Sequence, residues 1–207
     1  MAVKDIYQAV IGFDEDKAVE LTRAELEGGT DIQAILNEGL IAPMDEVGRL
    51  FSEGQLFVPE MLMAAQAMKA GLAIIKPLLA ETDSKPRGTV IIGTVKGDLH
   101  DIGKNLVAMM LEGAGFNVTD LGVDVESGRF ASEALSGKAD LVALSALLTT
   151  TMPAMEETVS TLKEQGAGVR TIIGGAPVTR SFADKIGADG YAEDAPSAVD
   201  LARRLLS

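Results

Sequence analysis

The chain has 207 residues, of which 47% are hydrophobic, and this length allows one large domain or two small domains with a buried core in each. Acidic residues number 31 against 18 Lys and Arg, giving a formal net charge of -13, and no basic cluster stands out, so nucleic acid is not expected as a partner. The absence of cysteine excludes disulfides, thiolate metal sites and cysteine nucleophiles.

Residues 1–10 contain no basic segment that leads into a long apolar one. No apolar run approaches the roughly 18 residues that a bilayer span requires. We therefore expect a cytoplasmic protein without a membrane segment, in which carboxylates, hydroxyls and a single histidine are left to carry any chemistry.

Up to about residue 83, apolar residues recur at helical spacing, as at Ile6 and Val10. The pattern predicts four or five helices packed as a small bundle, with helix starts at Asp14, Thr30 and Pro59. The polar segment that follows contains Pro86 and Gly88 and is typical of a linker. We predict a helical domain at 1–83, a linker at 84–88 and a second domain at 89–207.

In the second domain, short β-branched runs alternate with helical stretches. Strands are predicted at 89–95, 117–121, 139–145, 169–173 and about 190–192, and helices at about 102–114, 127–137, 151–166, 179–187 and from Pro196. Five such units predict a flavodoxin-like (Rossmann-type) parallel sheet of the order 2-1-3-4-5. The fold class is therefore α + α/β.

Ligands of such sheets bind beyond the carboxyl ends of the strands, near the point where the strand order reverses. Three unusual segments follow predicted neighbouring strands, at residues 97–103, 145–147 and 174–175. We expect these segments to converge on one site.

His100 is the only histidine of the chain. Together with Asp98 and Gly103 it forms the pattern D-x-H-x-x-G; 41 residues then separate Gly103 from Ser145, and 26 separate Leu147 from Gly174. These elements resemble the cobalamin-binding signature D-x-H-x-x-G, S-x-L and G-G that methionine synthase shares with its relatives.

The resemblance implies that His100 displaces the benzimidazole base of the cofactor and becomes the lower axial ligand of cobalt. Asp98 would accept a hydrogen bond from the other ring nitrogen, and Thr151 would complete this relay at a position where methionine synthase has a serine. From the residues alone, Asp98 could instead cap the following helix, and Thr151 could be a helix N-cap.

The same resemblance implies a channel beside the sheet for the nucleotide tail of the cofactor. Taken singly, the glycines could be ordinary turn residues and Ser145 an ordinary strand end. The implied cofactor-binding residues are Gly97, Asp98, Leu99, His100, Asp101, Ile102, Gly103, Ser145, Leu147, Thr149, Gly174, Gly175, Tyr191, Ala192 and Ala195.

In the first domain, residues 48–61 resemble the helical cap that covers the upper corrin face in methionine synthase. Phe51 matches the phenylalanine of that cap and Val58 matches its leucine. Without the resemblance, both would be read as core positions of a helical bundle.

The resemblance covers about residues 38–195, and the total length is similar to that of free-standing corrinoid proteins of methyltransferase systems. Residues 147–152 look like those of members that serve methanol, methylamine, glycine betaine or methoxy-aromatic demethylation. The implied function is a methyl carrier without catalysis of its own, which binds cobalamin (as methylcobalamin or a related corrinoid) base-off and His-on. The implied partners are a substrate-specific methyltransferase, an acceptor methyltransferase and a reductive activase.

Three alternatives stay open. A cobalamin-dependent sensor or gene regulator can use the same cap and fold, although such proteins normally add a basic DNA-binding domain and a tryptophan in the cap. The small subunit of a cobalamin mutase carries D-x-H-x-x-G but generally lacks the helical bundle. A flavodoxin-like module without cobalt would make the spacing of the three elements a coincidence.

Overall fold

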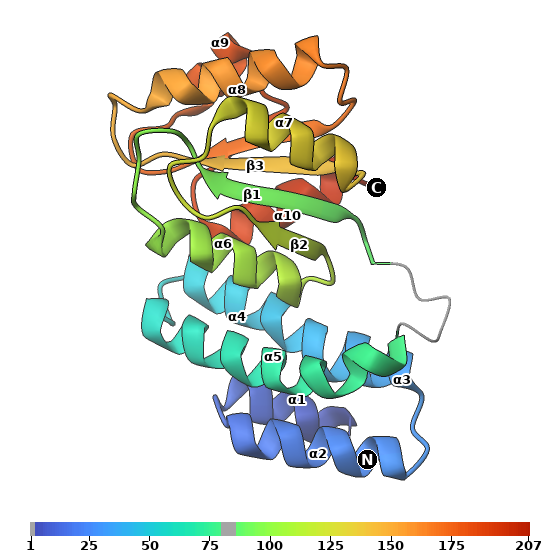
Figure 1. The fold of residues 1–207 in the computed structure, drawn as a ribbon. Coiled ribbons are helices and arrows are strands. Elements are labelled where there is room, and N and C mark those ends of the chain that lie inside the picture. The colour runs from blue at the N-terminus through green and yellow to red at the C-terminus, as the bar shows by residue number, and fades with distance from the viewer. Residues whose placement is uncertain (1–2, 80–85) are drawn as a thin grey trace. The chain divides into compact units, whose positions relative to one another are not determined.

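The computed structural model describes residues 3–79 and 86–207 and forms two compact units. One unit contains the described residues up to 79 together with residues 113–115, and the other contains residues 86–112 and 116–207 (Figure 1). The predicted boundary at residue 83 and most of the predicted linker at 84–88 fall on residues 80–85, which lie outside the described residues. The domain limits therefore stay a prediction.

The first unit is a bundle of helices, as the periodicity predicts. The long helix α5 packs against α1, α2, η1 and α4. The elements are α1 (Val3–Ile11), α2 (Glu15–Glu27), α3 (Ile32–Ala34), the π-helix η1 (Ile35–Ile41), α4 (Ala42–Ser52) and α5 (Val58–Leu79).

Two predicted helix starts are confirmed and one is wrong by a residue. Asp14 caps α2, because its carboxylate accepts the N–H of Lys17 at 3.0 Å. Pro59 lies in the first turn of α5. Thr30 is not a cap: its hydroxyl donates to Glu25 at 2.5 Å, and the next residue, Asp31, caps α3 instead.

The helical segment between α3 and α4 contains a π-helical stretch that the pattern does not predict. Its last amide, that of Ala42, bonds to the carbonyl of Asn37, five residues back. Pro43 follows and has no N–H with which to continue an α-helical ladder. The wider turn keeps Ile35 and Leu40 in the core of the bundle.

Helix α5 has the length and composition of a membrane-crossing helix, although it contains no long uninterrupted apolar run. Residues 58–78 have the length and the mean hydropathy, 1.3, of a membrane-crossing helix. The charged residues Glu60, Lys69 and Lys76 divide this segment into short apolar runs, so the run length alone did not reveal it. In this unit the apolar face of α5 buries Met61, Met68 and other side chains among the surrounding helices, as expected for the core helix of a bundle.

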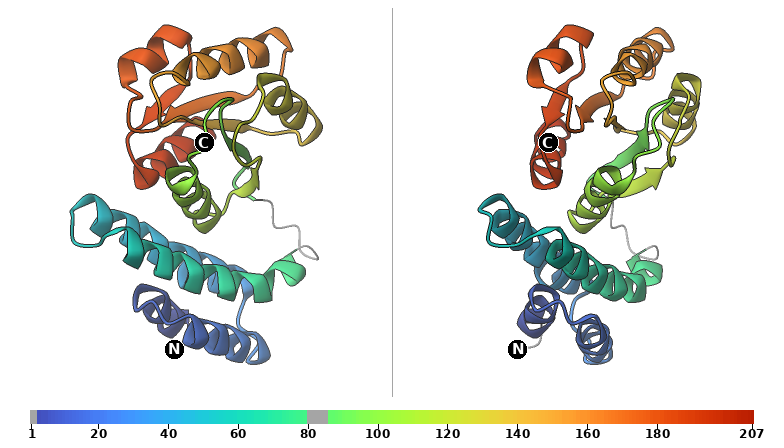
Figure 2. Two further views of the ribbon diagram at one scale, coloured as in Figure 1. Left: turned by 60° about the vertical axis from the view of Figure 1, so that its left-hand side comes forward. Right: turned by 90° about the vertical axis from the view of Figure 1, so that its left-hand side faces the viewer.

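The second unit contains the predicted five-stranded parallel sheet in the predicted order, β2-β1-β3-β4-β5. Helices α6 and α10 cover one face of the sheet, and α7, α8 and α9 cover the other (Figures 1 and 2). The strands are β1 (Thr89–Thr94), β2 (Asn117–Asp120), β3 (Leu141–Ser145), β4 (Arg170–Gly174) and β5 (Gly190–Ala192); the helices are α6 (Ile102–Gly113), α7 (Ser127–Ser136), α8 (Met152–Glu164), α9 (Arg180–Ile186) and α10 (Ala195–Leu205).

The central strands are buried on both faces, which explains their continuous apolar sequences. Strand register places Thr94 of β1 beside Ser145 of β3, and Ser145 beside Gly174 of β4. The last residues of these three strands therefore lie in one row at the carboxyl edge of the sheet. The segments 145–147 and 174–175 begin in this row, and the segment 97–103 begins three residues after Thr94.

Candidate functional site

Asp98 occupies the turn that follows β1 and is fully buried. The backbone N–H of Asp98 closes this turn by donating to the carbonyl of Val95 at 3.1 Å. Gly97 adopts a φ of 81° within this turn, a left-handed conformation that glycine reaches without steric cost. The turn brings the Asp98 side chain to the loop that follows β3.

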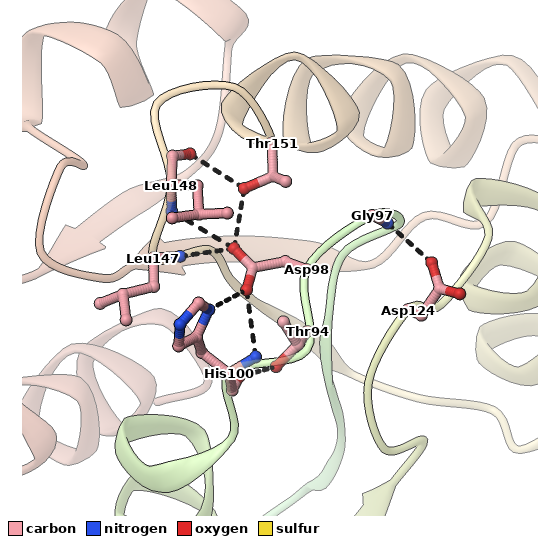
Figure 3. Close-up of polar contacts among 8 residues, drawn as sticks. All are labelled: Thr94, Gly97, Asp98, His100, Asp124, Leu147, Leu148 and Thr151. Atoms are coloured by element: carbon pink, nitrogen blue, oxygen red, sulfur yellow. Dashed lines mark hydrogen bonds and ion pairs between the residues drawn. The ribbon is translucent and has the colours of Figure 1, made fainter.

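The carboxylate of Asp98 accepts five hydrogen bonds (Figure 3). Its Oδ1 accepts the backbone N–H of His100 at 3.1 Å and lies 2.7 Å from the ring atom Nδ1 of the same residue. Its Oδ2 accepts the N–H groups of Leu147 and Leu148 at 2.7 and 3.3 Å and the hydroxyl of Thr151 at 2.7 Å. Two of the three predicted segments thus meet at one buried carboxylate.

These hydrogen bonds decide the charge of Asp98. Burial of the side chain acts to raise its pKa, but hydrogen bonds from the Leu147 N–H, the His100 ring, the Thr151 hydroxyl and the His100 N–H outweigh burial. The pKa of Asp98 is held well below its usual range, so the carboxylate is an anion at neutral pH.

The anion fixes the tautomer of His100. A carboxylate can only accept, so the proton of a neutral imidazole must sit on Nδ1, which leaves a lone pair on Nε2. The His100 side chain is 50% exposed, and no hydrogen bond to Nε2 is found among the described residues. Its backbone is held as well, because the buried hydroxyl of Thr94 donates to the His100 carbonyl at 2.8 Å. This arrangement presents a neutral nitrogen donor to a metal.

Thr151 stands at the N-cap position of α8, yet its side chain makes no capping hydrogen bond. Its hydroxyl lies 2.7 Å from Oδ2 of Asp98 and 2.9 Å from the carbonyl of Leu148. The extra methyl group of threonine faces Gly97, 3.6 Å from the point where a Cβ of that residue would stand. The hydroxyl keeps its bond to Asp98, so the change from serine to threonine leaves this contact in place.

The glycines of the site have two different roles. A Cβ on Gly103 would meet no protein atom within 4 Å, so this position borders open space. In contrast, a Cβ on Gly174 would lie 2.9 Å from the Ala192 carbonyl oxygen, and one on Gly175 only 1.9 Å from that of Ala146. Close packing of backbones requires the last two glycines, whether or not a ligand lies beside them.

Apolar side chains flank His100 and face solvent. Leu99 and Ile102 are 71% and 75% exposed, and Leu147 and Leu148 are 42% and 41% exposed. Exposed apolar groups gathered around one histidine indicate a ligand-binding surface. A broad ring that covers these groups and takes Nε2 as an axial ligand fits this surface, as does the open space beside Gly103.

The remaining predicted residues lie at the same edge of the sheet or just beyond it. Asp101 and Thr149 are exposed in the loops after β1 and β3, and Ser145 ends β3. Tyr191 and Ala192 belong to β5, and Ala195 begins α10. Arg180 packs over the Tyr191 ring at 5.9 Å. Their contacts with a cofactor tail stay a prediction.

Phe51 and Val58 belong to the first unit and flank its turn between α4 and α5. Both are partly exposed and do not belong to the buried core of the bundle, which is the alternative that the pattern alone favours. The neighbouring Phe57 is 65% exposed. The placement of Phe51 and Val58 over a corrin ring stays a prediction.

Sequence reasoning missed Thr94, Leu148 and Asp124. The N–H of Leu148 donates to Asp98, 50 residues away, and the hydroxyl of Thr94 donates to the His100 carbonyl. No sequence pattern around Leu148 or Thr94 predicts these hydrogen bonds. For Asp124, an acidic residue two positions after Gly122 in the loop between β2 and α7 gives a weak signal for a left-handed turn.

Comparison with known proteins agrees with this geometry. Residues 88–200 match a B12 binding domain, and residues 2–76 match a second type of B12 binding domain. The chain belongs to the B12-binding corrinoid proteins. The predicted cofactor, cobalamin or a related corrinoid, is therefore confirmed, and a flavodoxin-like module without a corrinoid is excluded.

Similar corrinoid proteins match this chain almost from end to end. Dimethylamine corrinoid protein 1 of Methanosarcina acetivorans is 46% identical over 99% of this chain and 97% of its own. Trimethylamine corrinoid protein 1 of the same organism is 45% identical over 96% and 94%. A chain in the methanol:cobalamin methyltransferase complex of Methanosarcina barkeri is 34% identical, with a TM-score of 0.89 over 99% of this chain and 79% of its own. A cobalamin-binding protein from Desulfitobacterium hafniense is 30% identical, with a TM-score of 0.82 over 99% and 98%.

Proposed function

We propose that this corrinoid protein is a methyl carrier, which receives a methyl group from a substrate-specific methyltransferase and delivers it to an acceptor methyltransferase. The observation that supports this most is the buried Asp98 carboxylate, which engages Nδ1 of the half-exposed His100 ring and so leaves Nε2 as the unprotonated nitrogen, in a loop with exposed apolar side chains. A corrinoid bound there supplies a cobalt centre that accepts and releases methyl groups.

In this proposal each group of the chain has a defined task. His100 would hold the cobalt through Nε2, while Asp98 holds the ring through Nδ1–H. The exposed side chains of Leu99, Ile102 and Leu147 would contact the corrinoid. The open space beside Gly103 and the hydroxyl of Ser145, for which no partner is found among the described residues, accommodate the nucleotide tail.

Thr151 supports the Asp98 anion that holds the His100 ring. Its hydroxyl donates to the far oxygen of the carboxylate and stabilises the negative charge.

Phe51 and Val58 complete the proposal as the shield of the upper corrin face. Both are apolar and only partly buried within the first unit, so part of their surface is available to a ligand. A shield of this kind must give way when a partner enzyme approaches the methyl group.

The names of the relatives favour methylamines as the source of the methyl group. Dimethylamine and trimethylamine corrinoid proteins are 42–47% identical to this chain over at least 92% of its length. Among the solved structures, the chain of the methanol complex and a monomethylamine corrinoid protein are 34% and 33% identical. Their near-complete coverage of this chain favours the carrier over a regulator or a mutase subunit. We propose a methylamine methyltransferase, an acceptor methyltransferase and a reductive activase as partners, in the cytoplasm.

The test is a transfer assay with the reconstituted protein. The apo-protein is loaded with cobalamin, chemically reduced, and mixed with isotopically methyl-labelled dimethylamine or trimethylamine and a purified methyltransferase specific for that amine. We expect the label to become bound to the protein and to leave when an acceptor enzyme and a thiol are added. Loading with cobalamin but no labelling from either amine would contradict the methylamine assignment; labelling from methanol alone would assign the carrier to the methanol type.

A further inference from the structure

Asp124 lies outside the cobalamin signature but contacts the turn that carries Asp98. Its Oδ1 accepts the N–H of Gly97 at 2.7 Å (Figure 3). Its own N–H donates to the carbonyl of Asp98 at 3.0 Å. Two reciprocal hydrogen bonds thus connect this residue to the two residues that form the tip of the turn.

The backbone of Asp124 is bent to make these contacts. Its φ is 53°, in the left-handed region, where residues other than glycine are uncommon and Asn and Asp are the best tolerated. The segment is anchored on both sides of Asp124, since the Val125 N–H donates to the Thr94 carbonyl at 3.0 Å and the Thr94 N–H donates to the Gly122 carbonyl at 2.9 Å. Asp124 is therefore held rigidly beside the end of β1.

Two loops therefore hold Asp98 through hydrogen bonds. The loop after β3 binds its carboxylate through Leu147, Leu148 and Thr151. The loop after β2 binds its backbone carbonyl through Asp124. Without the Asp124 carboxylate, the Gly97 N–H loses its acceptor, and glycine at position 97 imposes little restriction on rotation of the backbone there. The Asp98 carboxylate would then leave the position at which it faces Nδ1 of His100.

We propose that Asp124 is a positioning residue for the axial histidine: it holds the Gly97–Asp98 turn so that Asp98 keeps the His100 ring in the Nδ1–H tautomer. The proposal rests on the proposed role of His100 as the cobalt ligand. It concerns the free protein, however, and can be tested there before any cobalamin is added.

Two variants of Asp124 and one control variant test its side-chain contact with Gly97. Asp124→Gly removes the carboxylate but keeps a residue that accepts the left-handed φ, so the lost bond is isolated from backbone strain. Asp124→Asn keeps both an acceptor oxygen and tolerance of this φ. Asp140→Ala is the matched control, because Asp140 also accepts a backbone N–H, that of Thr89 at 2.8 Å, but at the opposite end of β1.

The readout is the tautomer of His100 in the apo-protein, measured by long-range proton–nitrogen-15 NMR at a pH where the ring is neutral. The chain has one histidine, so protein without a histidine tag gives one imidazole signal set. We expect the Nδ1–H tautomer in the wild type, in Asp124→Asn and in Asp140→Ala, and a mixture of both tautomers in Asp124→Gly. Cobalamin affinity should fall about tenfold in Asp124→Gly, the lower end of the loss seen when a residue supporting a metal ligand is removed.

An unchanged Nδ1–H tautomer in Asp124→Gly would overturn the proposal, whatever happens to cobalamin binding. A changed tautomer with no histidine ligation to cobalt would leave the positioning role standing and contradict the proposed ligand instead. If Asp124→Gly does not fold, hydrogen exchange of the wild type decides: the exposed Gly97 amide should exchange slowly because Asp124 accepts it, and rapid exchange would overturn the proposal.

Discussion

Nδ1 of His100 lies 2.7 Å from Oδ1 of Asp98, although only one residue separates them in the sequence. The contact needs the tight turn after β1 and four further hydrogen bonds that keep the buried carboxylate charged. Because the carboxylate is charged, the exposed nitrogen of the ring is the one that carries a lone pair. The chemistry of the site follows from this relationship.

Replacing Asp98 by asparagine should destabilise the protein in a pH-dependent way. The amide cannot accept hydrogen bonds through both of its polar atoms, so we expect a loss of about 2 kcal/mol at neutral pH. Since the folded-state pKa of Asp98 is lowered, its contribution is fully present above the unfolded pKa and is lost as the pH falls toward the folded pKa.

The difference in unfolding free energy between wild type and Asp98→Asn should therefore be constant above about pH 5 and shrink below about pH 4. Urea denaturation across this range measures it. Asp101→Asn, at an exposed position of the same loop, is the control and should show a far smaller difference. A difference between wild type and Asp98→Asn that grows on acidification would show that the carboxylate is not charged in the folded state.

Variants of Thr151 test the contribution of its hydrogen bond to Asp98. Thr151→Val keeps the shape and loses the bond to Asp98, and should cost about 1–2 kcal/mol of stability and weaken cobalamin binding. Thr151→Ser keeps the hydroxyl and loses the methyl group that faces Gly97, and should bind cobalamin like the wild type. Cobalamin titration measures the affinities of the two variants. Equal affinity of Thr151→Ser and Thr151→Val would show that the hydroxyl does not contribute to cobalamin binding.

Substitution of Gly175 should affect folding, whereas substitution of Gly103 should affect cobalamin binding. Gly175→Ala places a Cβ in collision with the Ala146 carbonyl at a φ of 125°, so we expect a loss of more than about 3 kcal/mol or failure to fold. Gly103→Ala lies in the first turn of α6 beside open space and should leave stability equal or raise it by about 0.5 kcal/mol.

The same Gly103→Ala variant should bind cobalamin more weakly, because its methyl group enters the space assigned to the nucleotide tail. Isothermal titration and thermal unfolding of one preparation measure both effects. Wild-type affinity in this variant would place the tail elsewhere.

Thr22 provides a stability test away from the site. Its side chain is fully buried in α2, and its hydroxyl has no partner within the described residues. Thr22→Val should therefore raise the free energy of unfolding by about 1 kcal/mol. Thr158→Val is the matched control, because that buried hydroxyl donates to the Ala154 carbonyl at 2.7 Å, and the variant should not gain stability. Chemical denaturation of both variants tests the pair.

The sheet and its order could be predicted because each buried strand has a continuous β-branched run and each crossover contains a helix. The convergence of His100, Ser145 and Gly174 at one edge followed from that order. What could not be predicted are the contacts that depend on atomic geometry. The π-helical turn before Ala42 and the shift of a cap from Thr30 to Asp31 change local hydrogen bonding without changing the periodicity.

At the site itself, the family signature located Asp98 and His100 but could not reveal how the carboxylate is held. Its partners Leu147 and Leu148 contribute backbone amides, which every residue type has, so no sequence pattern marks them. Gly174 and Gly175 show the opposite limit: the signature marked them as lining a ligand channel, while the structure gives each a packing requirement of its own. Asp124 was missed because its contacts link two loops from different strands.

The ligand role of His100 can be measured most directly by electron paramagnetic resonance of the Co(II) protein. The chain has one histidine, so growth on nitrogen-15 histidine labels a single imidazole while added cobalamin keeps natural nitrogen-14 in its benzimidazole. We predict that each cobalt hyperfine line is split into a doublet in labelled protein and into a triplet in unlabelled protein, and that no protein nitrogen splits it in His100→Ala. A triplet that persists in the labelled protein would mean that benzimidazole remains on the cobalt, and would contradict the assignment of His100 as its axial ligand.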